Sequence, residues 1–229
     1  LDYQGVRGLQ LESIPATFLL LQAHRNPGRW DLGYAASKSF EISGPGVDTA
    51  MRWSTIAIII MLVLAVSWAL YRLCAGGWTT RTTMAFFSVM VLLLIATNKV
   101  FSPQYIVWLG PLLAVVIRQR LPQGFTTLRV VQGLLAVCAI IAASLGTLVY
   151  PFNYDYIWHY VGENMFPVYL LVARNILIVV MAIIGLIWFA LEVALAGKLE
   201  RAGIHQPQAP SALAQPVLRR RGGRHSLRS

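Results

Sequence analysis

The sequence is organised around the polar stretch Asn98-Lys99-Val100-Phe101-Ser102-Pro103-Gln104-Tyr105. It separates two apolar runs, residues 83–97 and 106–117, which as helices reach only about 27–28 Å when their flanking charges are included. A lipid hydrocarbon core is about 30 Å thick, so each run can barely span it. The turn between them should therefore lie at or just below one membrane surface. Irregular backbone at that depth persists only where protein covers it or water reaches it.

This turn carries four polar side chains of different chemistry, Lys99, Ser102, Gln104 and Tyr105. The Ser-Pro pair predicts a helix with Ser102 as N-cap and Pro103 as first residue. The free amides and positive dipole end of that helix, beside Lys99, would form an anion site suited to phosphate. The alternative is a helical hairpin turn whose Lys99 only reaches the membrane interface.

Composition places the chain in a membrane. Of its 229 residues, 57% are hydrophobic and 12% are charged. A soluble domain carries roughly 25% charged residues, so we expect an integral membrane protein. The net charge of +10 is concentrated in short loops and in the last thirty positions, and we expect no nucleic-acid partner.

Motifs for cofactors are missing from the sequence. There is no Walker A loop, GxGxxG, HExxH or Cys/His cluster, and we read Cys74 and Cys138 as small packing residues. We therefore expect no cofactor, while the sequence leaves a divalent cation open.

The pattern of apolar runs predicts an all-α, polytopic membrane protein in three parts. Residues 1–52 form an extracytoplasmic and interfacial segment, residues 53–197 a five-span membrane domain, and residues 198–229 a disordered basic tail. The spans are expected at residues 53–71, 83–97, 105–117, 130–149 and 168–191. The first part should hold a short interfacial or re-entrant helix at 14–23, a small hairpin within 30–42 and a break at 43–46. Because the chain starts at Leu1 without an initiator Met, we expect it to be the C-terminal part of a longer product.

Basic residues predict the orientation of the spans. Twelve of the nineteen lysines and arginines flank one side, in the 72–82 and 118–129 loops and the tail, and seven flank the other. Cytoplasmic loops carry the excess of Lys and Arg, so the tail should be cytoplasmic. Residues 1–52, the turn at 98–104 and the loop at 150–167 should then share the extracytoplasmic face of the cell membrane.

Two further groups of polar residues belong to that face. Arg7, Gln10 and Glu12 lie close together near the start of the chain. Arg7 and Glu12 can form a simple ion pair at the bilayer surface, or they can contact a head group or a sugar. The guanidinium fork of Arg7 is well matched to phosphate.

The loop at 150–160 combines many aromatic residues with Asp155 and His159. It can be an interfacial aromatic belt, or its rings and polar groups can hold a sugar. Asp155 and His159 are four residues apart and would share a helix face, either as an acid/base pair or, as we favour, as a hydrogen-bonded surface pair. Arg174 lies inside the fifth run, where a charge either has a function or reaches the interface along its own stem. We assign no role to Glu192.

Three stretches resemble signatures of glycosyltransferase family 87, a family of polyprenyl-phosphate-mannose-dependent mannosyltransferases from actinobacteria within the GT-C superfamily. The first is Asn98-Lys-Val-Phe-Ser-Pro-Gln-Tyr-Ile-Val-Trp-Leu-Gly-Pro111, the second Arg7-Gly-Leu-Gln-Leu-Glu-Ser13 and the third Phe40-Glu-Ile-Ser-Gly-Pro-Gly-Val-Asp48. The resemblance implies a multi-span mannosyltransferase that uses a lipid-linked sugar donor on the outer face. It also implies that Lys99, Ser102 and Gln104 bind the donor phosphate.

The same resemblance implies an inverting transfer with an aspartate base in an early outer loop. This chain has no such loop, so the catalytic base is expected upstream of it. The expected partners are a polyprenyl-phosphate sugar, a lipid or glycan acceptor and membrane lipids. A transporter or flippase for lipid-linked sugars, with the Ser102-Pro103 break as its binding site, and a non-catalytic membrane scaffold are the alternatives.

Overall fold

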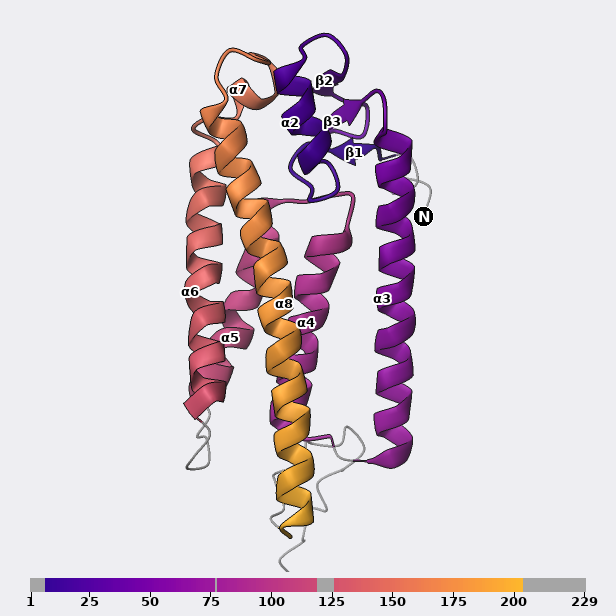
Figure 1. Ribbon diagram of the computed structural model, residues 1–229, viewed down its shortest axis with the longest axis vertical. Coiled ribbons are helices and arrows are strands. Elements are labelled where there is room, and N and C mark those ends of the chain that lie inside the picture. Colours follow the sequence, from indigo (N-terminus) through magenta and orange to yellow (C-terminus); the bar gives the residue numbers. More distant parts are fainter. Residues whose placement is uncertain (1–6, 77, 119–125, 204–229) are drawn as a thin grey trace, which may run out of the picture.

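Four long apolar helices build the body of the molecule (Figure 1). The structure, a computed structural model, describes residues 7–76, 78–118 and 126–203. The long helices are α3 (Val47–Ala75), α4 (Thr80–Thr97), α6 (Thr126–Val149) and α8 (Phe166–Arg201). Each is long and apolar enough to cross a bilayer, which confirms an all-α, polytopic membrane protein.

The expected third span is shorter than the others and begins irregularly. It consists of the 3₁₀-helix η1 (Pro103–Trp108) followed directly by α5 (Leu109–Arg118). A 3₁₀-helix rises about 2.0 Å per residue against about 1.5 Å in an α-helix, so the two together extend about 27 Å. The 3₁₀ stretch thus lengthens a run that would be short for a span as a regular α-helix.

Helix α8 is the centre of the bundle and packs against both α4 and α6. Its buried residues Ile178, Met181 and Trp188 share a core with Leu92 of α4 and Leu135 of α6. At Gly185 the helices come especially close, because a Cβ there would lie 2.9 Å from Leu92 Cδ1. Small residues permit this approach between membrane helices.

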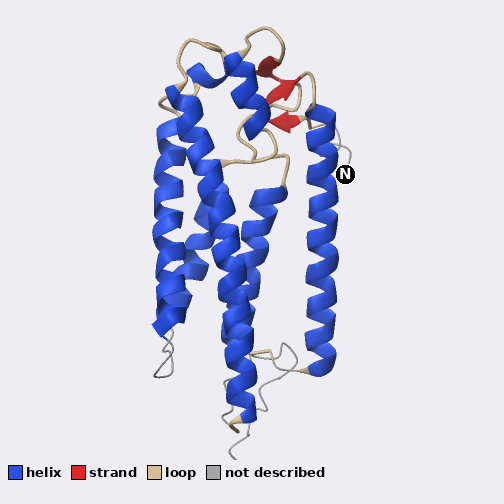
Figure 2. Cartoon of the chain, in the orientation of Figure 1, coloured by secondary structure: helices blue, strands red, loops and turns tan. Residues whose placement is uncertain are grey.

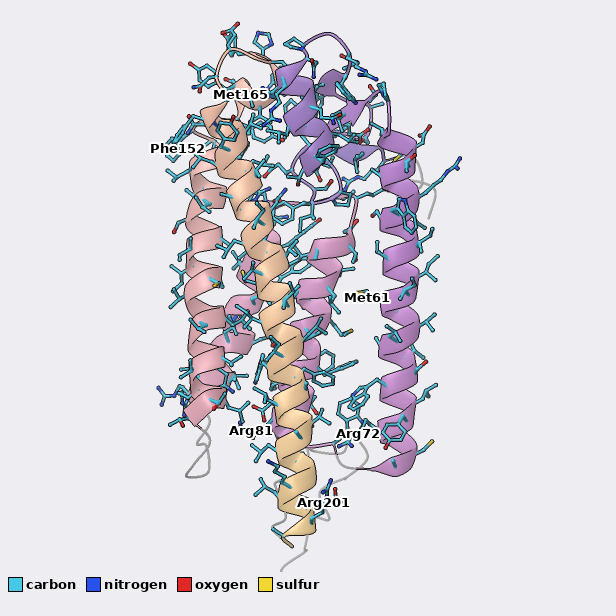
Figure 3. All side chains as sticks on the ribbon, viewed as in Figure 1. Met61, Arg72, Arg81, Phe152, Met165 and Arg201 are labelled. Carbon is cyan, nitrogen blue, oxygen red and sulfur yellow. The ribbon has the colours of Figure 1, made fainter. Side chains whose placement is uncertain are left out.

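Helix α3 stands apart from the others. Of the residues in its most apolar stretch only 6% are buried, against 33% in the corresponding stretch of α8. Ser54 Oγ donates to Thr97 O at 2.6 Å near one end of α3, and the Trp68 ring lies 5.3 Å from the Phe189 ring further along. Met61, between these two attachments, lies on the side of α3 toward α4 (Figure 3).

A small cap covers one end of the bundle (Figure 2). It contains α2 (Thr17–Arg25), α7 (Asp155–Trp158) and an antiparallel sheet of order β1-β3-β2. The strands are β1 (Leu9–Gln10), β2 (Asp31–Tyr34) and β3 (Phe40–Ser43). The short helix and the hairpin expected in the N-terminal segment are both present, although α2 begins and ends two or three residues later than expected.

The sheet contains one pairing that the sequence did not predict. Ile42 in β3 faces Leu32 of the hairpin on one side and Leu9 of β1 on the other. All three lie in the cap's hydrophobic core or pack against it. The break before α3 is also present, since Gly44 and Gly46 both have positive φ. The tail was expected to be disordered from residue 198, but α8 continues through Arg201, so its first residues are helical. The part beyond residue 203 lies outside the described residues.

Candidate functional site

The turn at residues 98–102 lies beneath the cap, which covers it (Figure 1). Gln10 N donates to Lys99 O at 3.1 Å, and Phe101 N donates to Gln10 Oε1 at 2.8 Å. Lys99 Nζ donates to Arg7 O at 2.5 Å. The N-terminal segment therefore supplies backbone and side-chain partners for the polar groups of this irregular turn.

A cavity of about 400 Å³ lies between this segment and the turn, and we call it the tyrosine cavity. Four phenol rings line it, those of Tyr34, Tyr105, Tyr150 and Tyr154. It brings together residues that the sequence analysis had proposed separately. The lining residues that were predicted as site residues are Arg7, Gln10, Glu12, Ser102, Gln104 and Tyr105.

A second hollow adjoins the first and is cationic. This cationic groove has a volume of about 750 Å³. Arg7, Arg52 and Lys99 line it, together with Asp48 and the apolar side chains of Met51 and Ile56 from α3. Arg7 lines both hollows, whereas Lys99 lines the groove and Ser102, Gln104 and Tyr105 line the tyrosine cavity.

The helix that begins at Ser102-Pro103 differs from the expected anion site. Its first six residues form a 3₁₀-helix, and the Ser102 side chain makes no capping hydrogen bond. Pro103 has no N–H, and Tyr105 N donates to Ser102 O at 2.9 Å. Ser102 and Pro103 hold the predicted positions of N-cap and first helical residue, but the helix is 3₁₀ and its tighter turn occupies the amide of Tyr105, so fewer free amides lie beside Lys99 than expected.

Arg174 and Glu12 form a buried ion pair beside the tyrosine cavity. The Arg174 side chain is 0% exposed, and its Nη1 donates to Glu12 Oε2 at 2.5 Å. Its Nη2 donates to Glu12 O at 2.9 Å, and its guanidinium lies 4.3 Å from the centre of the Phe101 ring. Asn175 Nδ2 donates to Glu12 O as well, at 3.2 Å.

This network bears on two interpretations of the sequence. Arg174 does not reach the interface along its stem, because it lies fully buried under the cap. Glu12 forms a buried ion pair with Arg174, a partner that the sequence analysis did not propose beside its alternatives of a pair with Arg7 or a contact with a head group or sugar. Glu12 of the cap and Arg174 of α8 neutralise each other at a buried position, where an unpaired charge would be costly.

Tyr154 lines the tyrosine cavity together with Glu12. Its burial, followed by the neighbouring Glu12 carboxylate, raises the pKa of the Tyr154 hydroxyl far above its ordinary value. The hydroxyl therefore stays protonated and can donate a hydrogen bond. The cavity wall thus places a protonated phenol beside a carboxylate that is held by a cation.

Asp155 and His159 lie outside both hollows as these are lined in the described chain. Both are exposed, and Asp155 Oδ1 accepts a hydrogen bond from Trp158 Nε1 at 3.2 Å. The His159 ring lies between those of Trp158 and Tyr160, at 5.1 and 4.7 Å. The expected side-chain hydrogen bond between Asp155 and His159 is not formed in this part of the structure, where the Asp155 carboxylate accepts a hydrogen bond from the Trp158 indole instead.

His24 is a buried residue that the sequence analysis missed. Its Nε2 lies 2.9 Å from Ile157 O, and its Nδ1 accepts from Gly162 N at 3.2 Å. Because a backbone N–H can only donate, the ring is neutral with its proton on Nε2. Burial lowers the pKa of His24, which favours this neutral form. A lone His in an amphipathic helix gives no sequence signal for such a contact.

A second buried ion pair lies toward the uncapped end, where Arg81 is seen in Figure 3. Arg81 Nε and Nη2 donate to the two carboxylate oxygens of Glu192 at 3.0 and 2.7 Å. Gln132 and Trp188 donate to the same carboxylate at 3.3 and 3.1 Å. These four residues, called the inner cluster below, give Glu192 a structural role in joining α4, α6 and α8. The sequence could have indicated a partner for Glu192, because a charged residue within an apolar run is usually paired.

Comparison of the chain with protein-family models, curated proteins and solved structures finds no match. Among the described residues, no group of three or more His, Cys, Asp or Glu side chains is placed to hold a metal ion. The chemistry of the site therefore has to be argued from its own side chains: a cationic groove with an apolar wall, joined through Arg7 to a cavity of phenols and amides.

Proposed function

We propose that the chain forms the donor-binding part of an integral membrane glycosyltransferase. It would move a sugar from a polyprenyl phosphate to a lipid or glycan acceptor at the extracytoplasmic face, and the family resemblance indicates mannose. The observation that carries this proposal is the position of Arg7, which lines both the cationic groove and the tyrosine cavity. A lipid phosphosugar has the matching order of parts: an apolar chain, a phosphate and a polyol.

The apolar side of the groove supports a role in lipid binding. Met51, Thr55 and Ile56 contribute one wall from α3, the helix that is least buried in the bundle. A polyprenyl chain could lie against this wall without the removal of any packed helix.

The cations of the groove support a role in phosphate binding. Arg7, Arg52 and Lys99 lie around one hollow, and hydrogen bonds between cations and phosphate are strong. In a glycosyl transfer the leaving lipid phosphate gains negative charge as the sugar departs. Fixed cations at that position would stabilise the transition state.

The tyrosine cavity supports a role in sugar binding. Phenol rings offer flat apolar faces with polar edges, and the amides of Gln10 and Gln104 can donate and accept hydrogen bonds. Glu12 adds a carboxylate acceptor for hydroxyl groups. The catalytic base is not assigned within this chain.

Lys99 offers the test of this proposal. Lys99→Ala in the complete protein should reduce transfer from a polyprenyl-phosphate sugar by about ten- to hundredfold, because a charge-assisted contact to phosphate is lost. Lys99→Arg should retain part of the activity. Thermal stability of the same purified samples should change little, since the Lys99 side chain makes one hydrogen bond, to a backbone carbonyl.

Arg201→Ala is the matched control, because it removes a cation at the uncapped end (Figure 3). Its transfer activity should equal that of the parent. Transfer by Lys99→Ala within twofold of the parent would remove Lys99 from the site. Loss of transfer together with a collapse in stability would instead make Lys99 part of the hairpin turn. A parent protein that moves the lipid-linked sugar across the bilayer without transferring the sugar would indicate a flippase.

A further inference from the structure

One residue at the tip of the cap hairpin holds an unfavourable backbone conformation. Lys38 has φ of 57°, and among the described residues it is the only one other than glycine with positive φ. This left-handed region is unfavourable for a residue with a Cβ, and Gly, Asn and Asp adopt it most easily. A lysine at this position costs conformational free energy that a glycine would not.

The hairpin that carries Lys38 is firmly held. Ala35 N donates to Ser39 O at 2.9 Å, and Lys38 N donates to Ala35 O at 2.9 Å. Ser39 Oγ donates to Glu41 Oε1 at 2.8 Å, and Ser37 Oγ donates to the same oxygen. These contacts fix the conformation of the tip without using the Lys38 side chain.

The hairpin also packs tightly on the segment that contains Arg7. A Cβ placed on Gly8 would lie 2.2 Å from Glu41 Oε2, so the Glu41 carboxylate lies directly against Gly8. The hairpin strand β3 pairs with β1, the strand that follows Arg7, the residue shared by the two hollows. Lys38 itself lines the tyrosine cavity, next to Ser39 and Phe40.

The Lys38 side chain is exposed and makes no hydrogen bond or ion pair within the described chain. The backbone contacts of the loop hold Lys38 in place, and its side chain adds no contact of its own in the described chain. The hairpin itself requires positive φ at this position, because short loops of this kind follow their turn with one residue in the left-handed region; the loop thus presents the Lys38 ammonium at the cavity wall. An unpaired ammonium at the wall of a cavity rich in phenols and amides can donate to three oxygen atoms of a ligand.

We propose that Lys38 binds the sugar of the lipid-linked donor, donating hydrogen bonds to its hydroxyl oxygens. This inference rests on the proposed function and adds a sugar ligand to it. The phosphate is assigned to the groove, where Arg7, Arg52 and Lys99 lie, and Lys38 lines the other hollow. Lys38 should therefore distinguish a donor that carries its sugar from one that lacks it.

The test is Lys38→Gly in the complete purified protein. Two lipids are titrated, polyprenyl-phosphate mannose and polyprenyl phosphate without a sugar, and thermal unfolding is measured on the same samples. The variant should bind the mannose-bearing lipid about tenfold more weakly and the sugar-free lipid within twofold of the parent. Its melting temperature should equal or exceed that of the parent, because glycine relieves the strain.

Two matched variants make the result specific. Lys38→Asn also tolerates the left-handed conformation and should behave like Lys38→Gly. Lys99→Ala should weaken the binding of both lipids by a similar factor, because it acts on the phosphate.

Each other outcome overturns the inference in a recognisable way. Unchanged binding of both lipids by Lys38→Gly would exclude Lys38 from the sugar site and leave the proposed function standing. Equal weakening of both lipids would show that Lys38 contacts phosphate. Lower melting temperatures in both Lys38 variants would assign the residue to hairpin stability. A parent protein that binds neither lipid would overturn the proposed function and this inference together.

Discussion

The molecule buries an arginine–carboxylate pair at each end, and the two pairs are built differently. In the inner cluster, Arg81 holds Glu192 with two hydrogen bonds, and Gln132 and Trp188 donate to the same carboxylate. All of these groups come from membrane helices. Under the cap, Arg174 of α8 holds Glu12, which comes from the N-terminal segment and lines the tyrosine cavity.

The difference separates a structural ion pair from one that also borders a site. Glu192 receives hydrogen bonds from three helical side chains on its two oxygens, so its carboxylate is occupied by the protein. Glu12 uses one carboxylate oxygen and its backbone carbonyl for Arg174, and it lines the tyrosine cavity. We expect both pairs to matter for stability and only the capped one to matter for ligand binding.

Removal of each arginine should have the largest effect. Arg174→Met leaves the Glu12 carboxylate buried without its cation, which should lower the free energy of unfolding by about 3–5 kcal/mol. Arg81→Met should cost less, about 1.5–3 kcal/mol, because the Arg81 side chain is 12% exposed and Gln132 and Trp188 remain as donors. Denaturant unfolding in detergent measures both. A larger loss for Arg81→Met would reverse the assigned order of the two pairs.

Neutralising each carboxylate should separate the two roles. Glu12→Gln and Glu192→Gln keep the size of the side chain and should each lower stability by about 1–3 kcal/mol. Glu12→Gln should also weaken binding of a polyprenyl-phosphate sugar by about tenfold, while Glu192→Gln should leave it unchanged once temperature is kept well below unfolding. Equal donor affinities in the two variants would show that Glu12 is as purely structural as Glu192.

The capped end should also respond to pH through His24, with a smaller effect. Burial lowers the pKa of His24, so the folded protein binds fewer protons than the unfolded chain below the ordinary His pKa of 6.5. Its contribution to stability is therefore complete above about pH 6.5 and decreases as pH falls through that value.

His24→Gln is the control for this effect, because an amide can replace both hydrogen bonds and does not titrate in this range. Melting temperature should fall more between pH 7 and pH 5.5 in the parent than in His24→Gln. Parallel pH profiles would show that other groups determine the acid sensitivity of the cap.

The sequence predicted features that depend on local pattern. The lengths of the apolar runs predicted the four long helices and the shorter fifth one. The Ser-Gly-Pro-Gly stretch predicted the break before α3 at the right place. The irregular turn at 98–102 needed a cover, and residues 7–14 provide it. Six of the ten proposed site residues, Arg7, Gln10, Glu12, Ser102, Gln104 and Tyr105, line the tyrosine cavity.

Features that depend on contacts between distant residues were missed. The sequence offered Arg7 as the partner for Glu12 because it is near in the chain, while the partner in the structure is 162 residues away. The pairing of β1 with β3 and the contact of His24 with Ile157 are long-range in the same way. The 3₁₀ start of η1 depends on local geometry that the Ser-Pro signal does not specify.

Arg174 and Glu12 are 162 residues apart in the sequence, and this separation bears on the order in which the protein is assembled. Glu12 is synthesised before helices α3 to α8, and its cation arrives only with α8. Contacts so far apart in sequence form late, since the intervening chain must be in place first. We therefore expect the cap to close over the turn only after α8 has inserted. A ribosome-bound chain that stops before Arg174 should therefore still lack a closed cap.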